Sequence, residues 1–185
     1  NTRMVNNLAG LSGGCLFLKN NNYVNISKSK LTKNIASNKN GGCISMKLNS
    51  NITMEHSVLS NNYANVDGGG IFVQENSNVA YINASIVINN TAHLGNGGAI
   101  YGSATSILNT NFTDNSAMYN GGALYTNLLI SNALTIKNTE FHKNSAHQSS
   151  GGGIHIYKTY SNPTTVYLDE CHITSNTAYN DGGFM

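Results

Sequence analysis

The side chains that could perform acid–base or metal chemistry are few in this sequence, and they are scattered along the chain. The 185 residues include eight carboxylates, six histidines and three cysteines. Hydrolysis of a glycoside needs two carboxyl groups roughly 5 to 9.5 Å apart, and a zinc ion needs several nitrogen or sulfur ligands around one centre. The spacings HExxH and CxxC, which supply such ligands locally, are absent. Any catalytic or metal site must therefore be assembled by the fold, so the elements that position these residues come first.

A repeated pattern runs through the whole sequence. Each copy contains an apolar residue, an Asn three positions later and an Ala two positions after that Asn. The first apolar residue is Met4 and the seventh is Ile173, so the mean period is (173 − 4)/6, or about 28 residues. A fixed period of this length is typical of stacked repeats. The seven repeated asparagines are Asn7, Asn34, Asn62, Asn90, Asn115, Asn144 and Asn176.

A pair of glycines follows each of these asparagines at a distance of 6 or 7 residues. Glycine adopts the positive φ angles that a tight corner requires, and every pair is preceded by Ser, Asn or Asp, which favour turns. An aliphatic residue stands two positions after most of the pairs. The pairs begin at Gly13, Gly41, Gly68, Gly97, Gly121, Gly151 and Gly182, and the seventh copy ends with Phe184 and Met185.

Alternating residues before the second to seventh copies of the pattern, such as Val24 and Ile26, have the periodicity of a β-strand. One repeat therefore predicts three short strands, which cannot bury their apolar face alone and must stack on the next repeat. We predict an all-β fold with a single domain over residues 1–185: a right-handed parallel β-helix, or β-solenoid, of about seven coils. The seven asparagines are predicted to form a structural ladder in which amide hydrogen bonds pass from coil to coil.

The segments "GGAIY" and "GGALY", coupled to "FTDN" and "FHKN", resemble the GGA(I/L/V) and FxxN repeats of the chlamydial polymorphic outer membrane proteins. This resemblance covers essentially the whole chain, although Leu, Val, Ile or Met replaces Phe in most copies. It implies a surface β-helix, extracellular or at the cell surface, because members of that family serve as autotransporter passengers and adhesins. The repeat itself is scaffolding, so the resemblance indicates the fold more specifically than the function.

Charge and hydropathy exclude two classes of partner. Charged residues make up 10% of the chain and the formal net charge is +2, whereas nucleic-acid binding needs a dense basic face. No apolar run approaches the roughly 18 residues of a membrane span. We therefore expect no nucleic acid as a partner, and no membrane span in this segment.

The predicted coils also separate the chemically active side chains. Glu55 and Asp169 share a phase but lie four coils apart, about 19 Å at 4.8 Å per coil. His93 and His147 share a phase two coils apart, about 10 Å by the same spacing, and Asp67 has the character of a turn residue. We therefore expect no catalytic residue, no metal site and no cofactor, and we predict that the protein is not an enzyme.

Cysteine is more informative. Cys15 and Cys43 occupy the same position in adjacent repeats, so their Cα atoms should lie about 4.8 Å apart, within the range of a disulfide. The pair is a candidate disulfide, and the alternative is that both are small apolar residues in a column of Gly and Ala. Cys171 has no cysteine partner in the same phase.

Two sets of outward positions are candidates for surface function. Outward residues beside the Gly-Gly strands form an aromatic column that could dock a partner or sugar rings, although strand propensity and cross-strand stacking explain it about as well. Five N-x-S/T sequences are candidates for N-glycosylation. The column comprises Phe17, Ser45, Phe72, Tyr101, Tyr125 and His155, of which all but Ser45 form the candidate docking column. The glycosylation candidates are Asn25, Asn51, Asn83, Asn89 and Asn111.

These features favour a non-catalytic structural or adhesive protein, part of a secreted or cell-surface rod, fibre, filament or adhesin. The chain begins and ends inside predicted strands, so we expect uncapped ends and a segment of a longer solenoid or a fibre-forming unit. Its expected partners are neighbouring β-helix segments or copies of itself, placed head to tail or laterally, and glycans. The alternative is a carbohydrate-active β-helix, similar to a polysaccharide lyase or hydrolase, with unrecognised catalytic loops.

Overall fold

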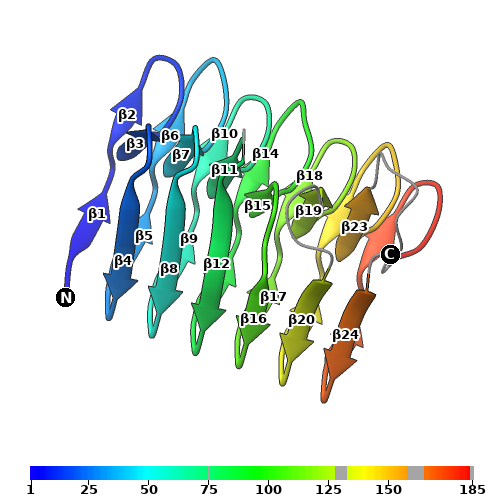
Figure 1. The fold of residues 1–185 in the computed structure, drawn as a ribbon. Helices are drawn as coiled ribbons and strands as arrows, with labels where there is room; N and C mark the ends of the chain where they lie inside the picture. Colours follow the sequence, from blue (N-terminus) through cyan, green and yellow to red (C-terminus); the bar gives the residue numbers. More distant parts are fainter. Residues whose placement is uncertain (75, 128–132, 158–164, 184–185) are drawn as a thin grey trace.

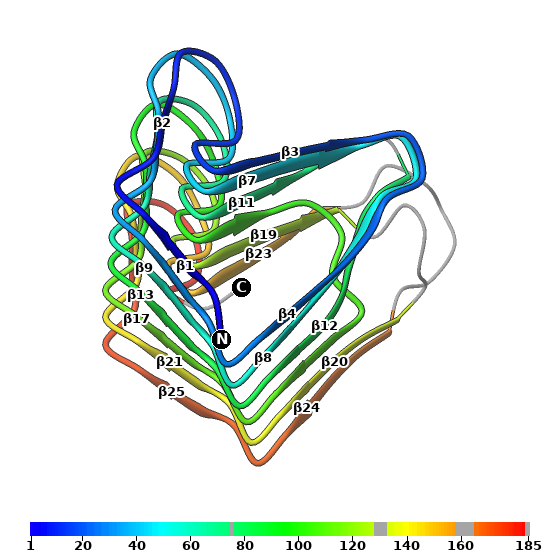
Figure 2. The same ribbon diagram turned by 90° about the vertical axis from the view of Figure 1, so that its left-hand side faces the viewer.

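The chain forms a parallel β-solenoid in the computed structural model, which describes residues 1–74, 76–127, 133–157 and 165–183 (Figure 1). Each strand pairs in parallel with the strand one coil earlier and one coil later. Viewed from the N-terminal end in Figure 2, the chain runs clockwise as it recedes, so the solenoid is right-handed. The predicted fold class is confirmed. Phe184 and Met185 of the seventh copy lie outside the described residues.

Two seven-stranded sheets adjoin the corner that carries the repeated asparagines. Sheet A holds the apolar residue of each repeat, and sheet B consists of two-residue strands that contain its Ala. Sheet A is formed by β1 (Arg3–Val5), β5 (Lys30–Thr32), β9 (Val58–Ser60), β13 (Ile86–Ile88), β17 (Asn111–Thr113), β21 (Glu140–His142) and β25 (His172–Thr174). Sheet B is formed by β2 (Leu8–Ala9), β6 (Ile35–Ala36), β10 (Tyr63–Ala64), β14 (Thr91–Ala92), β18 (Ser116–Ala117), β22 (Ser145–Ala146) and β26 (Thr177–Ala178).

Two six-stranded sheets complete each coil, so the solenoid makes about six full turns. Sheet C follows the Gly-Gly pairs, and sheet D precedes the next repeat. Sheet C is formed by β3 (Leu16–Lys19), β7 (Ile44–Lys47), β11 (Ile71–Val73), β15 (Ile100–Tyr101), β19 (Leu124–Asn127) and β23 (Ile154–Tyr157). Sheet D is formed by β4 (Tyr23–Ser27), β8 (Asn51–Glu55), β12 (Asn78–Asn83), β16 (Ser106–Leu108), β20 (Ala133–Lys137) and β24 (Thr165–Asp169).

Each complete coil therefore contains four strands, whereas the sequence predicted three. The additional strand is that of sheet B, which is only two residues long and follows the ladder asparagine directly. A residue with positive φ stands immediately before each asparagine, as Asn89 (φ 54°) stands before Asn90. This left-handed residue bends the backbone sharply, which separates sheet B from sheet A.

The seven repeated asparagines form a continuous buried ladder. In the central coils, Nδ2 of Asn62 donates to Oδ1 of Asn90 at 2.9 Å, and Nδ2 of Asn90 donates to Oδ1 of Asn115 at 3.0 Å. The main-chain N–H of Asn90 donates to the same Asn115 oxygen, while Nδ2 of Asn90 also donates to the carbonyl oxygen of Leu59. Both ends of each central amide are thus satisfied, which is what burial of an amide requires.

A second ladder, which the sequence had indicated only as turn residues, lies at the corner before the Gly-Gly pairs. Oδ1 of Asp67 accepts hydrogen bonds from the main chain and the side chain of Asn96, and Oδ1 of Asn96 accepts the same pair from Asn120. Its donors lie one coil after their acceptors, whereas in the first ladder they lie one coil before. The two corners are therefore tied in opposite directions along the axis.

A third ladder, of hydroxyl groups, occupies the corner between sheets D and A. The main-chain N–H of Ser57 donates to Oγ of Ser85, and that of Ser85 donates to Oγ1 of Thr110. Each hydroxyl donates in turn to the carbonyl two residues earlier in its own coil. Cys171 takes the next place in this column after Thr139, and its Sγ donates to the carbonyl of Asp169 at 3.4 Å.

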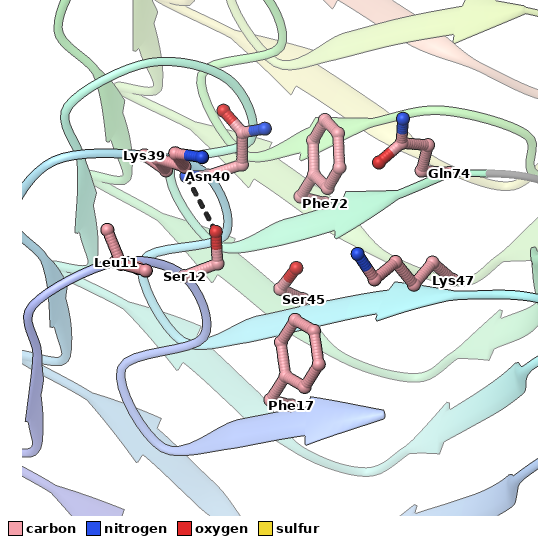
Figure 3. Close-up of a pocket in the computed structure, with 9 residues that line it drawn as sticks. All are labelled: Leu11, Ser12, Phe17, Lys39, Asn40, Ser45, Lys47, Phe72 and Gln74. Carbon is pink, nitrogen blue, oxygen red and sulfur yellow. Dashed lines mark hydrogen bonds between the residues drawn. The ribbon is translucent and has the colours of Figure 1, made fainter. Parts of the chain in front are cut away.

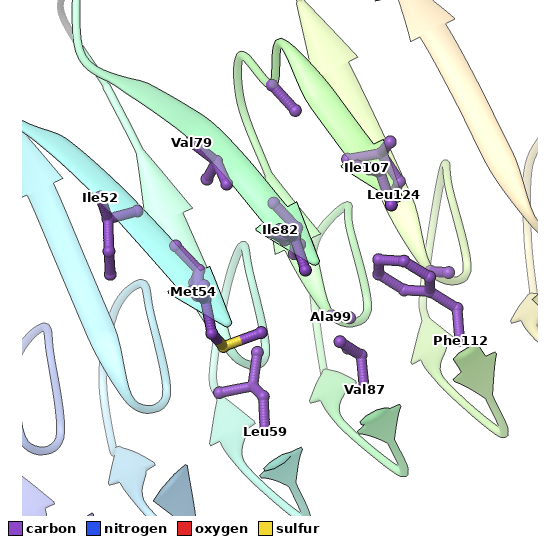
Figure 4. Close-up of a cluster of buried hydrophobic side chains, with 14 of the residues drawn as sticks. Ile52, Met54, Leu59, Val79, Ile82, Val87, Ala99, Ile107, Phe112 and Leu124 are labelled. Carbon is purple, nitrogen blue, oxygen red and sulfur yellow. The ribbon is translucent and has the colours of Figure 1, made fainter. Parts of the chain in front are cut away.

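The interior is filled by one apolar side chain from each strand of sheet A and by one or two from each strand of sheets C and D (Figure 4). Leu59, Val87 and Phe112 from sheet A are fully buried and occupy successive coils. The rings of Phe112 and Phe141 stack with their centres 4.8 Å apart. The core is thus a column whose repeat equals the spacing between strands, and the outward faces of the sheets carry everything else.

Candidate functional site: the outward face of sheet C

An aromatic column runs along the outward face of sheet C. The ring centres of Phe72 and Tyr101 are 5.0 Å apart, those of Tyr101 and Tyr125 are 4.9 Å apart, and those of Tyr125 and His155 are 5.4 Å apart. Parallel strand pairing places these residues directly beside one another in successive coils, and stacked rings gain about 0.5–1.5 kcal/mol per pair beyond simple burial. Four of the five predicted docking residues are therefore in one continuous stack.

The column is interrupted in the second complete coil. Strand pairing aligns Ser45 between Phe17 on one side and Phe72 on the other, so the stack lacks one ring at this position (Figure 3). Phe17 is 51% exposed, whereas Ser45 is 4% exposed. A hollow of about 440 Å³ lies over this break, a size found among ligand pockets. Its lining comprises Leu11, Ser12, Phe17, Lys39, Asn40, Ser45, Lys47, Phe72 and Gln74.

The prediction that the column is exposed along its length needs one correction. Phe72 is only 7% exposed. Tyr101 covers one face of its ring, and the loops that follow sheet B rise beside the outward face of sheet C (Figure 2). Asn40, from one of these loops, stands near Phe72 in the wall of the hollow (Figure 3). The aromatic column therefore lies in a depression rather than on an open surface.

Burial changes the protonation behaviour of this face. Burial and, to a smaller extent, the neighbouring Tyr101 raise the pKa of Tyr125 to about 12. Burial also raises the pKa of Asp67, whose oxygen accepts hydrogen bonds from Asn96 that partly oppose the shift. Burial lowers the pKa of His155 below its usual value. The rings of the column are therefore neutral at physiological pH. This favours stacking of a ligand that presents an uncharged ring face.

The remaining histidines and carboxylates do not converge. His93 packs against Tyr63 with ring centres 5.8 Å apart, and a ring nitrogen of His147 hydrogen-bonds to the hydroxyl of Ser116 at 2.8 Å. Asp169 forms an exposed ion pair with Lys137 at 2.6 Å. Across residues 1–74, 76–127, 133–157 and 165–183, the structure contains no group of three or more His, Cys, Asp or Glu residues that could hold a metal ion.

The candidate disulfide residues meet inside the solenoid. Sγ of Cys15 and Sγ of Cys43 lie 2.7 Å apart, and both residues are free thiols in this structure. Nδ2 of the ladder residue Asn34 donates to Sγ of Cys43 at 3.4 Å. Burial and the neighbouring Cys15 raise the pKa of the Cys43 thiol well above its usual value. The two thiols are adjacent as expected, and the covalent bond between them stays a prediction.

The five glycosylation candidates lie on strands or corners with access to solvent. Asn25, Asn51 and Asn83 are on the outward face of sheet D, where Asn25 and Asn83 are also hydrogen-bonded to residues of the next coil. Asn89 occupies a left-handed corner and donates to Asn61 at 2.6 Å, and Asn111 is exposed at the start of β17. Whether they are glycosylated remains a prediction.

Within the described residues, the structure contains no helix long and apolar enough to cross a membrane.

The family model of the Chlamydia polymorphic membrane protein repeat matches the sequence three times, at residues 56–74, 84–103 and 109–127. Each matched segment includes one strand of sheet A, a ladder asparagine, a Gly-Gly pair and one strand of sheet C. Searches of curated proteins and of solved structures found no match.

Proposed function

Because this chain carries repeats of the Chlamydia polymorphic membrane protein type, we propose that it is an adhesive, non-catalytic segment of an extracellular or cell-surface rod or fibre. The resemblance drawn from the GGAIY and FTDN segments is confirmed, since both segments fall inside matched repeats. The family name places such repeats in membrane-associated proteins, which supports a surface location for this one.

The observation that carries the proposal is the aromatic column of sheet C. Three consecutive ring contacts of 4.9 to 5.4 Å, from Phe72 to His155, make a rigid apolar strip along the axis of the solenoid. Such a strip contributes little to the core, which is formed by the opposite side chains of the same strands. A long outward face of stacked rings with polar loops beside it fits recognition of a ligand or partner.

The proposal includes the other surface features as accessories. Neighbouring solenoid segments or further copies of the chain are the proposed structural partners, since each coil presents the main-chain groups on which the next coil pairs. Glycans are the proposed ligands of the outward face. Attached sugars at the sheet D candidates Asn25, Asn51 and Asn83 would leave sheet C uncovered, because the two sheets form different faces of the solenoid (Figure 2).

Three measurements on the full 185-residue chain test this proposal. Antibodies raised against the chain should label intact, unpermeabilised cells of its source, and the purified chain should compete with the adhesion of those cells. The chain should give no unsaturated or reducing products from polygalacturonate, alginate or neutral polysaccharides. Labelling only after permeabilisation would contradict the surface location, and turnover lost on substituting a carboxylate would establish the enzymatic alternative instead.

A further inference from the structure

The break in the aromatic column at Ser45 has the dimensions of a binding slot. Phe17 and Phe72 are separated by two coil spacings, about 10 Å in total, with Ser45 aligned between them. A ring placed midway would lie about 5 Å from each aromatic ring, within the 4.5–7 Å range of stacked rings. Elsewhere in the column, the protein's own rings fill this spacing at 4.9 and 5.0 Å. Ser45 and Phe72 are only 4% and 7% exposed, and Nζ of Lys47 lies over the Phe17 ring, so a ring from outside enters the break by displacing the Lys47 side chain.

Polar groups stand at the rim of the hollow above this break. Two loops that belong to adjacent coils contribute Ser12 and Asn40, whose main-chain N–H donates to Oγ of Ser12 at 3.4 Å. Gln74 lies at the opposite side (Figure 3). Amide and hydroxyl groups at the rim of an apolar slot suit a ligand that has a ring with apolar faces and hydrogen-bonding groups around its edge. A pyranose has this distribution, because its hydroxyl groups radiate from the ring when they are equatorial.

The positive charge around the hollow favours a ligand that carries a negative charge. Lys39 and Lys47 both line it, and none of its nine described lining residues is acidic. Nζ of Lys47 points toward the break and lies 5.5 Å from the centre of the Phe17 ring (Figure 3). An ammonium group beside a partly buried slot attracts an anionic substituent and is screened less than a fully exposed one.

We infer that the Ser45 slot binds one pyranose ring that carries a carboxylate, a hexuronate unit of an acidic glycan. The C–H groups on the two faces of the ring contact Phe17 and Phe72, whose ring faces are electron-rich. The carboxylate pairs with Lys47, and the polar rim accepts and donates hydrogen bonds to the ring hydroxyls. No bond is made or broken, so the site is a binding site only.

This inference deepens the proposed function by naming a ligand class, and it rests on the proposed binding role of the sheet C face. The two are separable by experiment. Labelling of intact cells reports whether the protein lies at the cell surface, whereas saccharide binding at the slot requires the small side chain of Ser45. If the slot binds no uronate, the proposed surface location and the proposed absence of enzymatic turnover are unaffected.

The decisive variant fills the slot with the protein's own ring. Ser45→Tyr should continue the column from Phe72 to Phe17 at the spacing already used by Tyr101 and Tyr125, so the variant should fold. With a hyaluronan-derived tetrasaccharide as the probe, isothermal titration calorimetry of the full chain should show binding to the unmodified protein and at least a tenfold weaker affinity for Ser45→Tyr. Thr135→Tyr, which adds the same side chain to the outward face of sheet D, should retain the unmodified affinity.

The charge requirement is tested with a second variant and a neutral probe. The unmodified protein should bind the hyaluronan tetrasaccharide at least tenfold more tightly than chitotetraose, which has the same equatorial ring type without a carboxylate. Lys47→Met should lower the affinity for the hyaluronan tetrasaccharide about fivefold or more and leave the affinity for chitotetraose unchanged. An increase in salt concentration should weaken binding of the hyaluronan tetrasaccharide only.

Several results would overturn the inference. Absence of hyaluronan binding to the unmodified chain, or equal binding by Ser45→Tyr, would show that the slot does not hold a uronate ring. Equal affinity for both tetrasaccharides would remove the role of Lys47. If no saccharide bound and Ser45→Tyr instead abolished binding of a protein partner, the slot would hold an aromatic side chain of that partner rather than a sugar ring.

Discussion

The asparagine ladder and the aromatic column are two stacks in the same solenoid, and they differ in completeness. All seven positions of the ladder hold asparagine, and each adjacent pair is joined by an amide hydrogen bond of 2.8 to 3.0 Å. The outward column of sheet C changes from Phe to Tyr to His along its length and loses its ring at Ser45. One stack holds the same residue in every coil, and the other varies from coil to coil.

The difference follows from what surrounds each stack. A ladder amide is buried, so an absent partner would leave donors and acceptors unsatisfied in two neighbouring coils. An outward ring can be replaced by a small side chain because flexible neighbours on the same face, such as Lys47 over the Phe17 ring, can cover the space. The inner stack therefore maintains the fold, whereas the outer stack is free to carry binding, and five experiments separate these roles.

The largest effect is expected where coils approach most closely. A Cβ added at Gly98 would lie 2.0 Å from the carbonyl oxygen of Gly122 and 2.6 Å from the main-chain nitrogen of Ser116. Neither backbone atom can move without separating the coils, so Gly98→Ala should cost about 4 kcal/mol or more, or prevent folding. Denaturant unfolding measures this, with Gly10→Ala as the control because nothing lies within 4 Å of its added Cβ. Equal stability of the two variants would contradict the close packing.

Removal of one ladder amide should have the next largest effect. Asn90→Ala deletes the acceptor of Asn62 and the donor to Asn115, which leaves several buried groups without partners. The free energy of unfolding should fall by about 3–4 kcal/mol. Asn111→Ala, at an exposed position, should change it by less than about 0.5 kcal/mol. A small effect at Asn90 would mean that the ladder does not hold the coils together.

The predicted Cys15–Cys43 disulfide would reinforce the ladder side of the molecule. It would close a loop of about 28 residues, which corresponds to about 3–4 kcal/mol from the entropy of the unfolded chain. Oxidised protein should therefore unfold at a higher denaturant concentration than reduced protein, and the difference should vanish in Cys15→Ser. Intact mass measured without reduction tests the bond itself, because two separate thiols after mild oxidation would contradict it.

Completion of the outer column should have a smaller effect, of opposite sign. Ser45→Tyr creates two ring contacts, with Phe17 and Phe72, and should stabilise the protein by about 1 kcal/mol. Its thermal midpoint should rise by a few degrees relative to the unmodified protein, with Thr135→Tyr as the matched control. A destabilised variant would show that the break at Ser45 is a packing requirement rather than an open slot.

The smallest effect concerns ionisation within the outer column. Since burial raises the pKa of Tyr125 to about 12, the folded protein holds this phenol proton more tightly than the unfolded chain, whose tyrosines titrate near 10. The resulting stabilisation is fully present below pH 10 and is lost as the pH rises from about 10 to 12. Burial also raises the pKa of Tyr101, so absorbance at the tyrosinate band should show more than one late-titrating phenol, one of which is absent in Tyr125→Phe. Titration of all tyrosines near pH 10 would contradict the burial of this ring.

The sequence predicted the ladder well because its evidence is periodic. Asn7 and its six counterparts recur at one phase, and only stacking of coils makes that phase meaningful. It did not predict the strand of sheet B, since two residues such as Leu8 and Ala9 are too short for any periodic signal. The second ladder was visible only as turn residues, because Asp67 and Asn96 satisfy turn propensity and hydrogen-bond pairing with the same side chains.

The amino-acid sequence by itself determined the coil, its period, its glycine corners and its asparagine ladder, because each repeat makes the same demand on the same residue types. Only the tertiary structure decided how the irregular residues meet. Leu11, Lys39 and Gln74 occupy loops and strand ends in three successive coils, and their convergence around Ser45 depends on the path of those loops beside sheet C. Residues that recur with the repeat period form columns when the coils stack, so these columns can be predicted from the sequence. A hollow between loops is lined by side chains that do not recur with this period, so it cannot be predicted in the same way.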